Sequence, residues 1–401
     1  MSSALPPPTV VSDRAGLDEL LMALKGERVI AVDTEADAFF SYHQKLCLVQ
    51  ITASRRDWLV DPLADLDLSP LGEMLADPER VKVLHDAEFD ILLLGGLHEF
   101  RLAGLFDTRV AAAVLGSANP GLANVLSARF DVQLDKSMQR SDWSKRPLSE
   151  KQIDYARLDT HYLPDLHEML YAECVERDRL MIVESECRRL EQLRPVPTDV
   201  QPDDFVRVKG ARDLNPVQRA VFKELFVLRD NLAQKSDKPT FRVISNQALL
   251  DVARRRPDNY RALTAIKGFT SRMATRMGDE VLDAVVRGLG ADPIERLPRA
   301  PRKAGALDLD EATQELHERL KRWRKKAADS LGIESAYVLN RHLLGRLAQE
   351  RPDSLESLRA IEGIQDWQLS RFGDGIISVV LKFLEEESAG LLPKKRKKRL
   401  R

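Results

Sequence analysis

The sequence predicts a mixed α/β domain followed by two small all-helical bundles. In the first half, short apolar runs typical of strands are interspersed with stretches of helical periodicity. A proline-punctuated segment, residues 194–202, ends this part of the chain. Behind it, two segments of about 80 residues resemble each other at a constant offset of 95 and are mainly helical in pattern. The 401 residues are enough for these three domains.

The first domain is expected to open with a helix and to continue with strands. Ser12 or Asp13 precedes a leucine-rich periodic segment, as the N-cap of a helix does. Runs typical of β-strands follow at Val29–Asp33, Leu46–Ile51, Trp58–Val60 and Val81–Leu84. Helical patterns come next at Ala87–Leu94, Thr108–Leu115 and Gly121–Phe130.

A further helix is expected to begin at Ser149. The segment Ser149-Glu150-Lys151-Gln152 is a capping box, in which the first and last side chains satisfy each other's backbone groups. This helix would carry Tyr155 and Asp159 on one face, because residues four apart are neighbours on a helix. Pro164 is expected to kink or end its first segment.

The second half contains a duplicated helical domain. Arg256-Pro257-Asp258 recurs as Arg351-Pro352-Asp353, and Ala265-Ile266 recurs as Ala360-Ile361. An ungapped offset over this span indicates duplication, and each copy is expected to fold as a compact helical bundle. The expected divisions are a first domain at 1–193, a linker at 194–206, helical domains at 207–290 and 308–388 with a linker at 291–307, and a basic tail at 389–401.

The net charge of −1 conceals a strong asymmetry between the two halves. Residues 1–200 contain 22 basic and 34 acidic side chains, a net of −12, whereas residues 201–401 contain 40 and 29, a net of +11. We interpret this as metal-bound chemistry in the first half and polyanion binding in the second. The last eight residues, Lys394–Arg401, include seven basic side chains, expected to form a solvated tail with non-specific phosphate attraction.

The cysteines and the N-terminus indicate a reducing compartment. Cys47, Cys174 and Cys187 are an odd number without CxxC spacing, which argues against a disulfide scaffold or zinc site. The segment Met1–Thr9 lacks the basic and apolar regions of a signal peptide, and no apolar stretch is long enough to span a bilayer. We therefore expect a cytoplasmic protein with no membrane partner, and we favour a monomer.

Four carboxylates of the first domain stand in apolar surroundings. Asp33 and Glu35 close an apolar run, and their two-residue spacing places them on one face of a strand. Asp90 lies within an apolar helical segment, and Asp159 lies on an inward-facing stripe with Tyr155. Enclosing several carboxylates costs hydration and adds mutual repulsion, which divalent cations would neutralise. The set therefore points to metal-dependent phosphodiester chemistry.

Each of these residues receives an expected role in a site for two divalent ions, Mg²⁺ or Mn²⁺. Two ions roughly 4 Å apart clamp the attacking and leaving oxygens of an in-line displacement. We expect Asp33 to bridge the ions, Glu35 and Asp159 to bind the ion that activates water, and Asp90 to bind the other through water. With an ordinary pKa of about 10, Tyr155 is a poor base, so we expect it to orient the attacking water by a hydrogen bond.

The ordered set resembles the DEDD exonuclease superfamily, in its tyrosine-bearing subgroup. The three motifs are Asp33-Thr34-Glu35, the segment His85–Asp90, and Tyr155-x-x-x-Asp159. The histidine subgroup would need a histidine where this chain has Asp154. The second motif begins with His85, where the broader superfamily often carries asparagine; ribonuclease D-like sequences also use histidine there.

Further segments narrow the resemblance to the ribonuclease D family. Phe106–Ala113, Lys136–Trp143 and Arg146–Ser149 look like that family, and the duplicated half looks like two HRDC domains, which are helical nucleic-acid-binding modules. The resemblance implies a ribonuclease H-like fold with a central mixed sheet. It also implies 3′→5′ hydrolytic release of nucleoside 5′-monophosphates from RNA with a free 3′ end, including trimming of tRNA precursors and other small structured RNAs.

Two alternative functions are compatible with the same sequence features. The carboxylates would serve DNA as well as RNA, so a DNA 3′→5′ exonuclease is the first alternative. The second is a nucleic-acid-binding adaptor with an inactive nuclease fold, although all four carboxylates and the tyrosine are present.

Four other side chains have both a structural and a functional interpretation. His85 could touch the terminal nucleotide, but a structural role is slightly favoured. Asp107 precedes a helix, so capping is favoured over metal binding. Trp143 is equally compatible with core packing and with base stacking. Trp323 occupies the position of Leu228 in the other copy, which favours the core.

Overall fold

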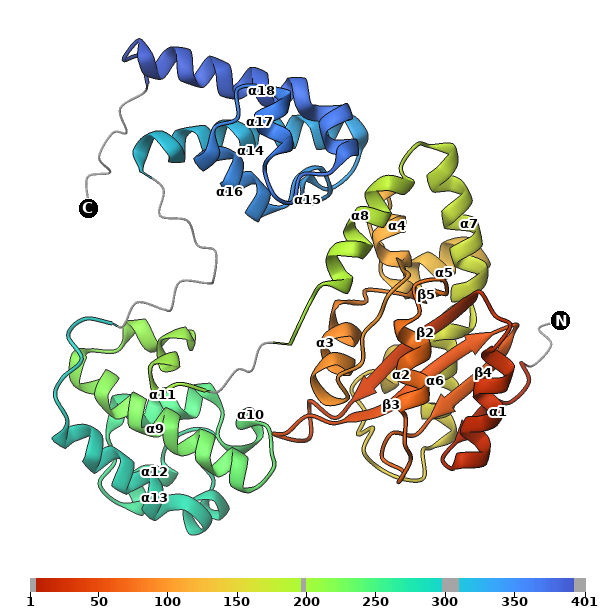
Figure 1. Cartoon of the computed structure of the whole chain (residues 1–401). Coiled ribbons are helices and arrows are strands. Elements are labelled where there is room, and N and C mark those ends of the chain that lie inside the picture. Colours follow the sequence, from red (N-terminus) through yellow and green to blue (C-terminus); the bar gives the residue numbers. More distant parts are fainter. Residues whose placement is uncertain (1–4, 196–199, 298–309, 393–401) are drawn as a thin grey trace.

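The computed structural model describes residues 5–195, 200–297 and 310–392, and it contains an α/β domain and two helical units (Figure 1). Residues 196–199, 298–309 and 393–401 lie outside the described residues. They include part of each expected linker and most of the expected basic tail. We call residues 202–290 the first helical unit and residues 311–388 the second helical unit.

The α/β domain is built on a six-stranded mixed sheet with strand order β1-β4-β3-β2-β5-β6. Its strands are β1 (Thr9–Val11), β2 (Val29–Ala36), β3 (Leu46–Ala53), β4 (Arg56–Val60), β5 (Val81–Leu84) and β6 (Leu105–Asp107). The pairs β2–β3 and β3–β4 are antiparallel, and the other neighbours are parallel. The predicted central mixed sheet and its four predicted strands are confirmed, whereas the three-residue strands β1 and β6 were not predicted.

Helices surround this sheet (Figure 1). They are α1 (Arg14–Leu24), α2 (Ser69–Ala76), α3 (Glu88–Leu97), α4 (Thr108–Val114), α5 (Leu122–Phe130), α6 (Glu150–His161), α7 (Leu163–Glu176) and α8 (Leu180–Glu191), with a 3₁₀ turn η1 (Lys136–Met138). Asp13 caps α1 by accepting a hydrogen bond from the Gly16 amide at 2.8 Å. The capping box of Ser149 and Gln152 begins α6 as predicted. The first segment ends at His161 and α7 begins at Leu163 with Pro164 in its first turn, which agrees with the predicted break at Pro164.

The first helical unit has its own core. Its elements are η2 (Pro202–Arg207), η3 (Ala211–Asp213), α9 (Pro216–Lys235), α10 (Thr240–Val243), α11 (Asn246–Arg255), α12 (Tyr260–Thr264) and α13 (Ser271–Gly290). Phe205 and Val206, which fall in the expected linker, are buried in this core because both side chains are apolar. The packed unit therefore begins before the expected boundary at residue 207.

The second helical unit repeats the first. Its elements are α14 (Glu311–Leu331), α15 (Ser335–Val338), α16 (Arg341–Glu350), α17 (Leu355–Arg359) and α18 (Asp366–Ser388). Arg256 and Arg351, which are 95 residues apart, both have φ of 51° and end α11 and α16 respectively. Gly268 and Gly363 both have positive φ, at 88° and 94°. Two helical units with equivalent backbone turns bear out the duplication predicted from the offset.

The first helical unit contacts the connection between β2 and β3. The backbone amides of Tyr42 and His43 each donate to the Asp237 carboxylate at 3.0 Å. The Arg242 guanidinium lies 4.1 Å from the centre of the Phe40 ring, within range of a cation–π interaction. This connection therefore links the α/β domain to the first helical unit.

The second helical unit contacts a different part of the α/β domain, near the turn between α7 and α8. Arg371 forms an ion pair with Asp178 at 3.0 Å, and the Arg179 guanidinium donates to the Leu331 carbonyl at 2.6 Å. The two helical units thus use different residues to contact the α/β domain.

The sequence also predicted that the cysteines form no disulfide scaffold and that no segment spans a bilayer. Cys47, Cys174 and Cys187 are buried and form no disulfide. Among the described residues, no helix combines the length and the apolar character needed to cross a bilayer.

Candidate active site

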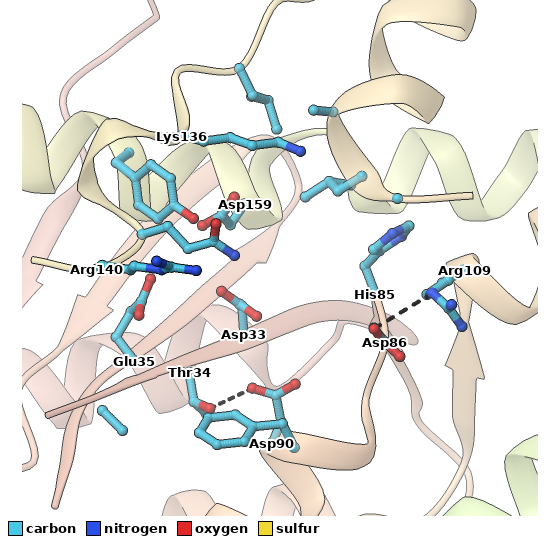
Figure 2. A pocket seen from close by; sticks show the side chains of 18 of the residues that line it. Asp33, Thr34, Glu35, His85, Asp86, Asp90, Arg109, Lys136, Arg140 and Asp159 are labelled. Atoms are coloured by element: carbon cyan, nitrogen blue, oxygen red, sulfur yellow. Dashed lines mark hydrogen bonds and ion pairs between the residues drawn. The ribbon is translucent and has the colours of Figure 1, made fainter. Parts of the chain in front are cut away.

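A cavity of about 610 Å³ is lined by residues of β2, α3 and α6, and all five predicted site residues are among them. Asp33 and Glu35 extend from β2, Asp90 from α3, and Tyr155 and Asp159 from α6. Figure 2 shows the carboxylates of Asp33, Glu35 and Asp159 turned toward one another. Residues that are far apart in the sequence are therefore brought together as predicted.

Three of the carboxylates form a tight group, and the fourth stands beside it. One oxygen each from Asp33, Glu35 and Asp159 lie within 4.8 Å of one another, a spacing that a single cation can bridge. Asp90 lies outside this group, is buried, and accepts a hydrogen bond from the Thr34 hydroxyl (Figure 2). All of these donors are oxygens, which suits hard cations such as Mg²⁺ and Mn²⁺.

The enclosure and crowding of these groups raise their pKa values. The pKa of Asp33 lies well above its ordinary value, first because the surrounding protein removes its water and then because of the charges of Asp90, Asp159 and Glu35. Burial away from solvent, together with the negative charges of Asp159 and Asp90, raises the pKa of Glu35 to about 9. In the absence of a cation, the site therefore retains protons at neutral pH, and bound cations would take their place.

Asp90 and Asp159 are also shifted, to a pKa of about 7 in each case. Loss of water raises both values, while a hydrogen bond from Thr34 to Asp90 and one from Tyr155 to Asp159 act in the opposite direction. Both hydrogen bonds favour the ionised carboxylate, which is the form that binds a cation.

Gln50 lies on the strand next to that of Asp33 and supports the Asp33 carboxylate. The sequence alone did not indicate this role. It lies directly opposite Asp33 in the antiparallel β2–β3 pair, and its side-chain amide donates to the Asp33 carboxylate at 3.4 Å. The side chain is fully buried. The available signal was a single amide within the apolar run Leu46–Ile51, but only the strand register shows what that amide contacts.

Asp107 fixes the backbone that leads into α3. Its carboxylate accepts hydrogen bonds from the amides of Arg109 and Val110, at 2.8 and 3.2 Å, and thereby caps α4. It also accepts from the amides of Asp86 and Ala87, at 3.1 and 2.9 Å. The predicted capping role is confirmed, and the same side chain holds the turn that positions Asp90.

His85 lines the cavity and is also held by the protein. Its Nδ1 lies 2.9 Å from the Thr108 hydroxyl, which itself donates to the Leu84 carbonyl at 3.0 Å. Because the hydroxyl hydrogen is used in that bond, His85 Nδ1 carries the donated hydrogen. Loss of water lowers the pKa of His85 to about 4, so the imidazole is neutral at pH 7.

Tyr155 is kept protonated and is packed against Trp143. Loss of water, followed by the charges of Asp159 and Glu35, raises the pKa of Tyr155 above its ordinary value. The indole of Trp143 is 1% exposed, and its centre lies 5.9 Å from that of the Tyr155 ring. The core-packing interpretation of Trp143 is confirmed, and Tyr155 is available as a hydrogen-bond donor, not as a base.

Basic and aromatic side chains occupy the rim of the cavity. Lys136 and Arg140 lie across the cavity from Asp90 (Figure 2), and the Arg140 guanidinium is 5.6 Å from the centre of the Phe39 ring. Phe39 and Phe89 also line the cavity and are 44% and 51% exposed. The sequence did not assign them to the site, because nothing distinguishes them from other basic or aromatic residues before folding. Together they can hold a phosphate and an unstacked base.

Comparison with known families divides the chain as the fold does. Residues 8–174 match a family model described as 3′-5′ exonuclease, and residues 218–285 and 313–380 each match the HRDC domain. The first match contains all five site residues. The other two matches lie within the first and second helical units.

Individual relatives agree with these matches. The chain is 30% identical to a ribonuclease D of Gluconacetobacter diazotrophicus over 380 residues, which cover 94% of each chain. It is also similar to the catalytic core of RRP6 from Trypanosoma brucei, at 27% identity and a TM-score of 0.67, with coverage of 72% and 82%. The fold is shared with Escherichia coli RNase D, at 24% identity and a TM-score of 0.64, with coverage of 94% and 99%.

Proposed function

Because this chain belongs to the ribonuclease D family and is a 3′→5′ exoribonuclease, we propose that it trims the 3′ ends of tRNA precursors and other small structured RNAs, releasing nucleoside 5′-monophosphates. The observation that carries the proposal is the convergence of four carboxylates and a protonated tyrosine on one open cavity. The choice of tRNA precursors rests on the resemblance to the family. The proposal of tRNA precursors thus names a substrate class for the exoribonuclease reaction.

The proposed site residues would hold two divalent cations, Mg²⁺ or Mn²⁺. Asp33 would bridge both, Glu35 and Asp159 would complete one site, and Asp90 would serve the other through water. This division is supported by the close grouping of the first three carboxylates and by the separate position of Asp90. When bound, the cations would supply a water of lowered pKa and would neutralise charge that develops on the phosphate.

The remaining residues of the cavity position the reactants. In this structure the Tyr155 hydroxyl donates to Asp159. With a cation held by Asp159, the hydroxyl would donate instead to the attacking water and orient it, since its raised pKa keeps the proton on the hydroxyl. Lys136 and Arg140 hold the phosphate from the opposite side of the cavity. His85, neutral and fixed by Thr108, is placed beside the terminal nucleotide.

The test follows a 5′-labelled single-stranded RNA with a free 3′-OH in Mg²⁺ or Mn²⁺. We expect a ladder that shortens from the 3′ end, that disappears with EDTA, and that is absent with Asp33→Asn. Asp13→Asn is a matched control, because asparagine also caps helices well and Asp13 caps α1.

Parallel reactions address the open alternatives. A matched DNA oligonucleotide degraded as fast as the RNA would favour a DNA exonuclease. RNA that is bound but intact in every metal condition would favour an inactive adaptor. A tRNA carrying a 3′ extension then tests the substrate class, with shortening to the mature end as the expected result.

We also propose that the enzyme is cytoplasmic and monomeric, with the domain division given above adjusted to start the first helical unit near residue 202. Three unpaired buried cysteines support a reducing compartment. Light scattering checks the monomer against the chain mass of 45.3 kDa.

A further inference from the structure

We propose that the groove between α14 and α18 binds the phosphodiester backbone of RNA upstream of the 3′ end that enters the cavity. This groove, which we call the α14–α18 groove, has a volume of about 760 Å³. Its walls carry the basic side chains Arg322, Lys325, Lys326 and Lys382. The assignment of RNA as the ligand rests on the proposed function.

The two glutamates of the groove are paired with two arginines. Arg319 pairs with Glu315 at 2.9 Å and with Glu386 at 2.8 Å, and Arg322 lies 3.6 Å from Glu315. Lys325 and Lys326 are exposed and form no ion pair within the part of the chain that the structure describes. Apart from Asp329, the charge presented to solvent is therefore positive.

The groove also contains an aromatic surface. Trp323 lines it, half-buried, with its ring 5.9 Å from that of Phe372 in an edge-to-face arrangement. A Cβ atom at Gly375 would lie 2.9 Å from the Trp323 indole nitrogen, so the glycine allows the indole to lie against α18. Trp323 thus packs on the helical core and lines the groove at once. An aromatic ring among exposed basic side chains is a combination that suits single-stranded nucleic acid.

The face of the first helical unit that corresponds to the α14–α18 groove makes different contacts. At the offset of 95 residues, Lys325 corresponds to Asp230, whose carboxylate accepts a hydrogen bond from the Tyr42 hydroxyl at 3.1 Å. Arg322, Trp323 and Lys326 correspond to Val227, Leu228 and Asn231. In the first copy this face therefore contacts the α/β domain, whereas in the second copy no residue of the α/β domain lines it. Lys382 corresponds to Arg287, which is basic but forms an ion pair with Glu224 at 3.0 Å. Trp323, Lys325 and Lys326, in contrast, have no aromatic or basic counterpart in the first copy.

The charge of the α/β domain explains why a separate RNA-binding surface is needed. Residues 1–200 carry a net charge of −12, which repels RNA at long range. Beyond the contacts of Lys136 and Arg140 with the phosphate in the cavity, affinity for a polyanion is expected from the second half, where exposed lysines can release counterions from the RNA. The groove offers a concave, basic and partly aromatic surface for that purpose, and its exposed charge favours RNA over an apolar protein partner.

The test uses the full-length protein in EDTA, so that binding is measured without hydrolysis. Fluorescence anisotropy with a labelled single-stranded RNA gives Kd over a range of salt concentrations. We expect the triple variant Lys325→Gln, Lys326→Gln, Lys382→Gln to bind roughly tenfold more weakly at low salt and to lower the slope of log K against log salt by about 2.

The matched control is Lys209→Gln, Lys238→Gln, Lys267→Gln. These three lysines are exposed in the first helical unit, and the change in net charge is the same. We expect the control to keep nearly the wild-type slope. Equal slopes for the two triple variants would overturn the proposal, because the position of the charges would then not matter.

Failure of the groove and failure of the proposed function are distinguishable. A normal RNA ladder together with unequal slopes supports both proposals. A normal ladder with equal slopes overturns only the groove. Unequal slopes without any ladder overturn the hydrolytic function and leave RNA binding at the groove supported.

Discussion

The catalytic cavity and the α14–α18 groove use charge in opposite ways. In the cavity, like charges are enclosed and crowded, so that the pKa of Glu35 rises to about 9 and that of Asp33 lies well above its ordinary value. In the groove, Lys325 and Lys326 are exposed to solvent and form no ion pair among the described residues. Repulsion between the buried carboxylates is relieved only when they bind protons or cations, whereas the exposed lysines attract a polyanion at long range.

The comparison teaches that chemistry and affinity should be separable in this protein. Changes in the cavity should act on turnover, and changes in the groove should act on binding and its salt dependence.

Removal of the central carboxylate should have the largest effect. Asp33→Asn is expected to lower kcat by about a thousandfold or more, as for a loss of roughly 4 kcal/mol of transition-state stabilisation. RNA binding in EDTA should stay close to wild type. Single-turnover rates and anisotropy measure the two quantities, and substantial retained turnover would show that Asp33 does not hold the cations.

Loss of the tyrosine hydroxyl should have the next largest effect. Tyr155→Phe keeps the ring against Trp143 but removes the donor that we assign to the attacking water. A hydrogen bond to a charged group contributes about 1.5–3 kcal/mol, so kcat should fall roughly 10- to 100-fold with little change in KM. A change in KM alone would instead place Tyr155 in substrate binding.

The raised pKa values predict how the stability of the metal-free protein depends on pH. Glu35 titrates near 4.5 when unfolded and about 9 when folded, so the unfolded chain loses its proton first as the pH rises. The native state therefore loses stability between about pH 4.5 and 9. Below that window the side chain is protonated in both states and costs nothing.

This effect is measured by thermal unfolding in EDTA, with Asp33→Asn as the comparison. The variant has one carboxylate fewer in the crowded site. We expect the Tm of the wild type to fall relative to that of the variant by several degrees between pH 5 and 8. Mg²⁺ or Mn²⁺ should restore the wild type most at the higher pH, because binding requires ionised carboxylates. A difference in Tm that is independent of pH would contradict the described electrostatics.

The smallest predicted effect concerns the aromatic surface of the groove. Trp323→Leu introduces the residue that the first helical unit carries at the equivalent position. RNA affinity should fall about fivefold, near the lower end of the range for a stacked base, with an unchanged salt slope because no charge is altered. A reduced slope would indicate that the variant has disturbed the neighbouring lysines, and circular dichroism checks the fold.

The elements that could be predicted from the sequence were those with a local signal. Asp33 and Glu35 follow an apolar run, Ser149 and Gln152 form a capping box, and Asp159 lies one turn after Tyr155. Each pattern involves residues within a few positions of one another. The order of the motifs along the chain then indicated that these carboxylates meet.

The elements that could not be predicted depend on contacts between distant segments. Gln50 supports Asp33 only through the β2–β3 register, and β1 and β6 are too short to give a periodic pattern. Lys136 and Arg140 reach the cavity because the chain after α5 passes over it. The different uses of the two helical units depend on which copy meets the α/β domain, and Asp230 gives no sign of that in the sequence.

The most direct test of this separation is the single-turnover rate on a 5′-labelled RNA as a function of enzyme concentration. We expect Asp33→Asn to be inactive at every concentration. The groove variant with Lys325, Lys326 and Lys382 changed to glutamine should need more enzyme to reach half its maximal rate and should approach the wild-type maximum. A lower maximum for the groove variant, or a normal maximum for Asp33→Asn, would contradict the assignment of chemistry to the cavity and affinity to the groove.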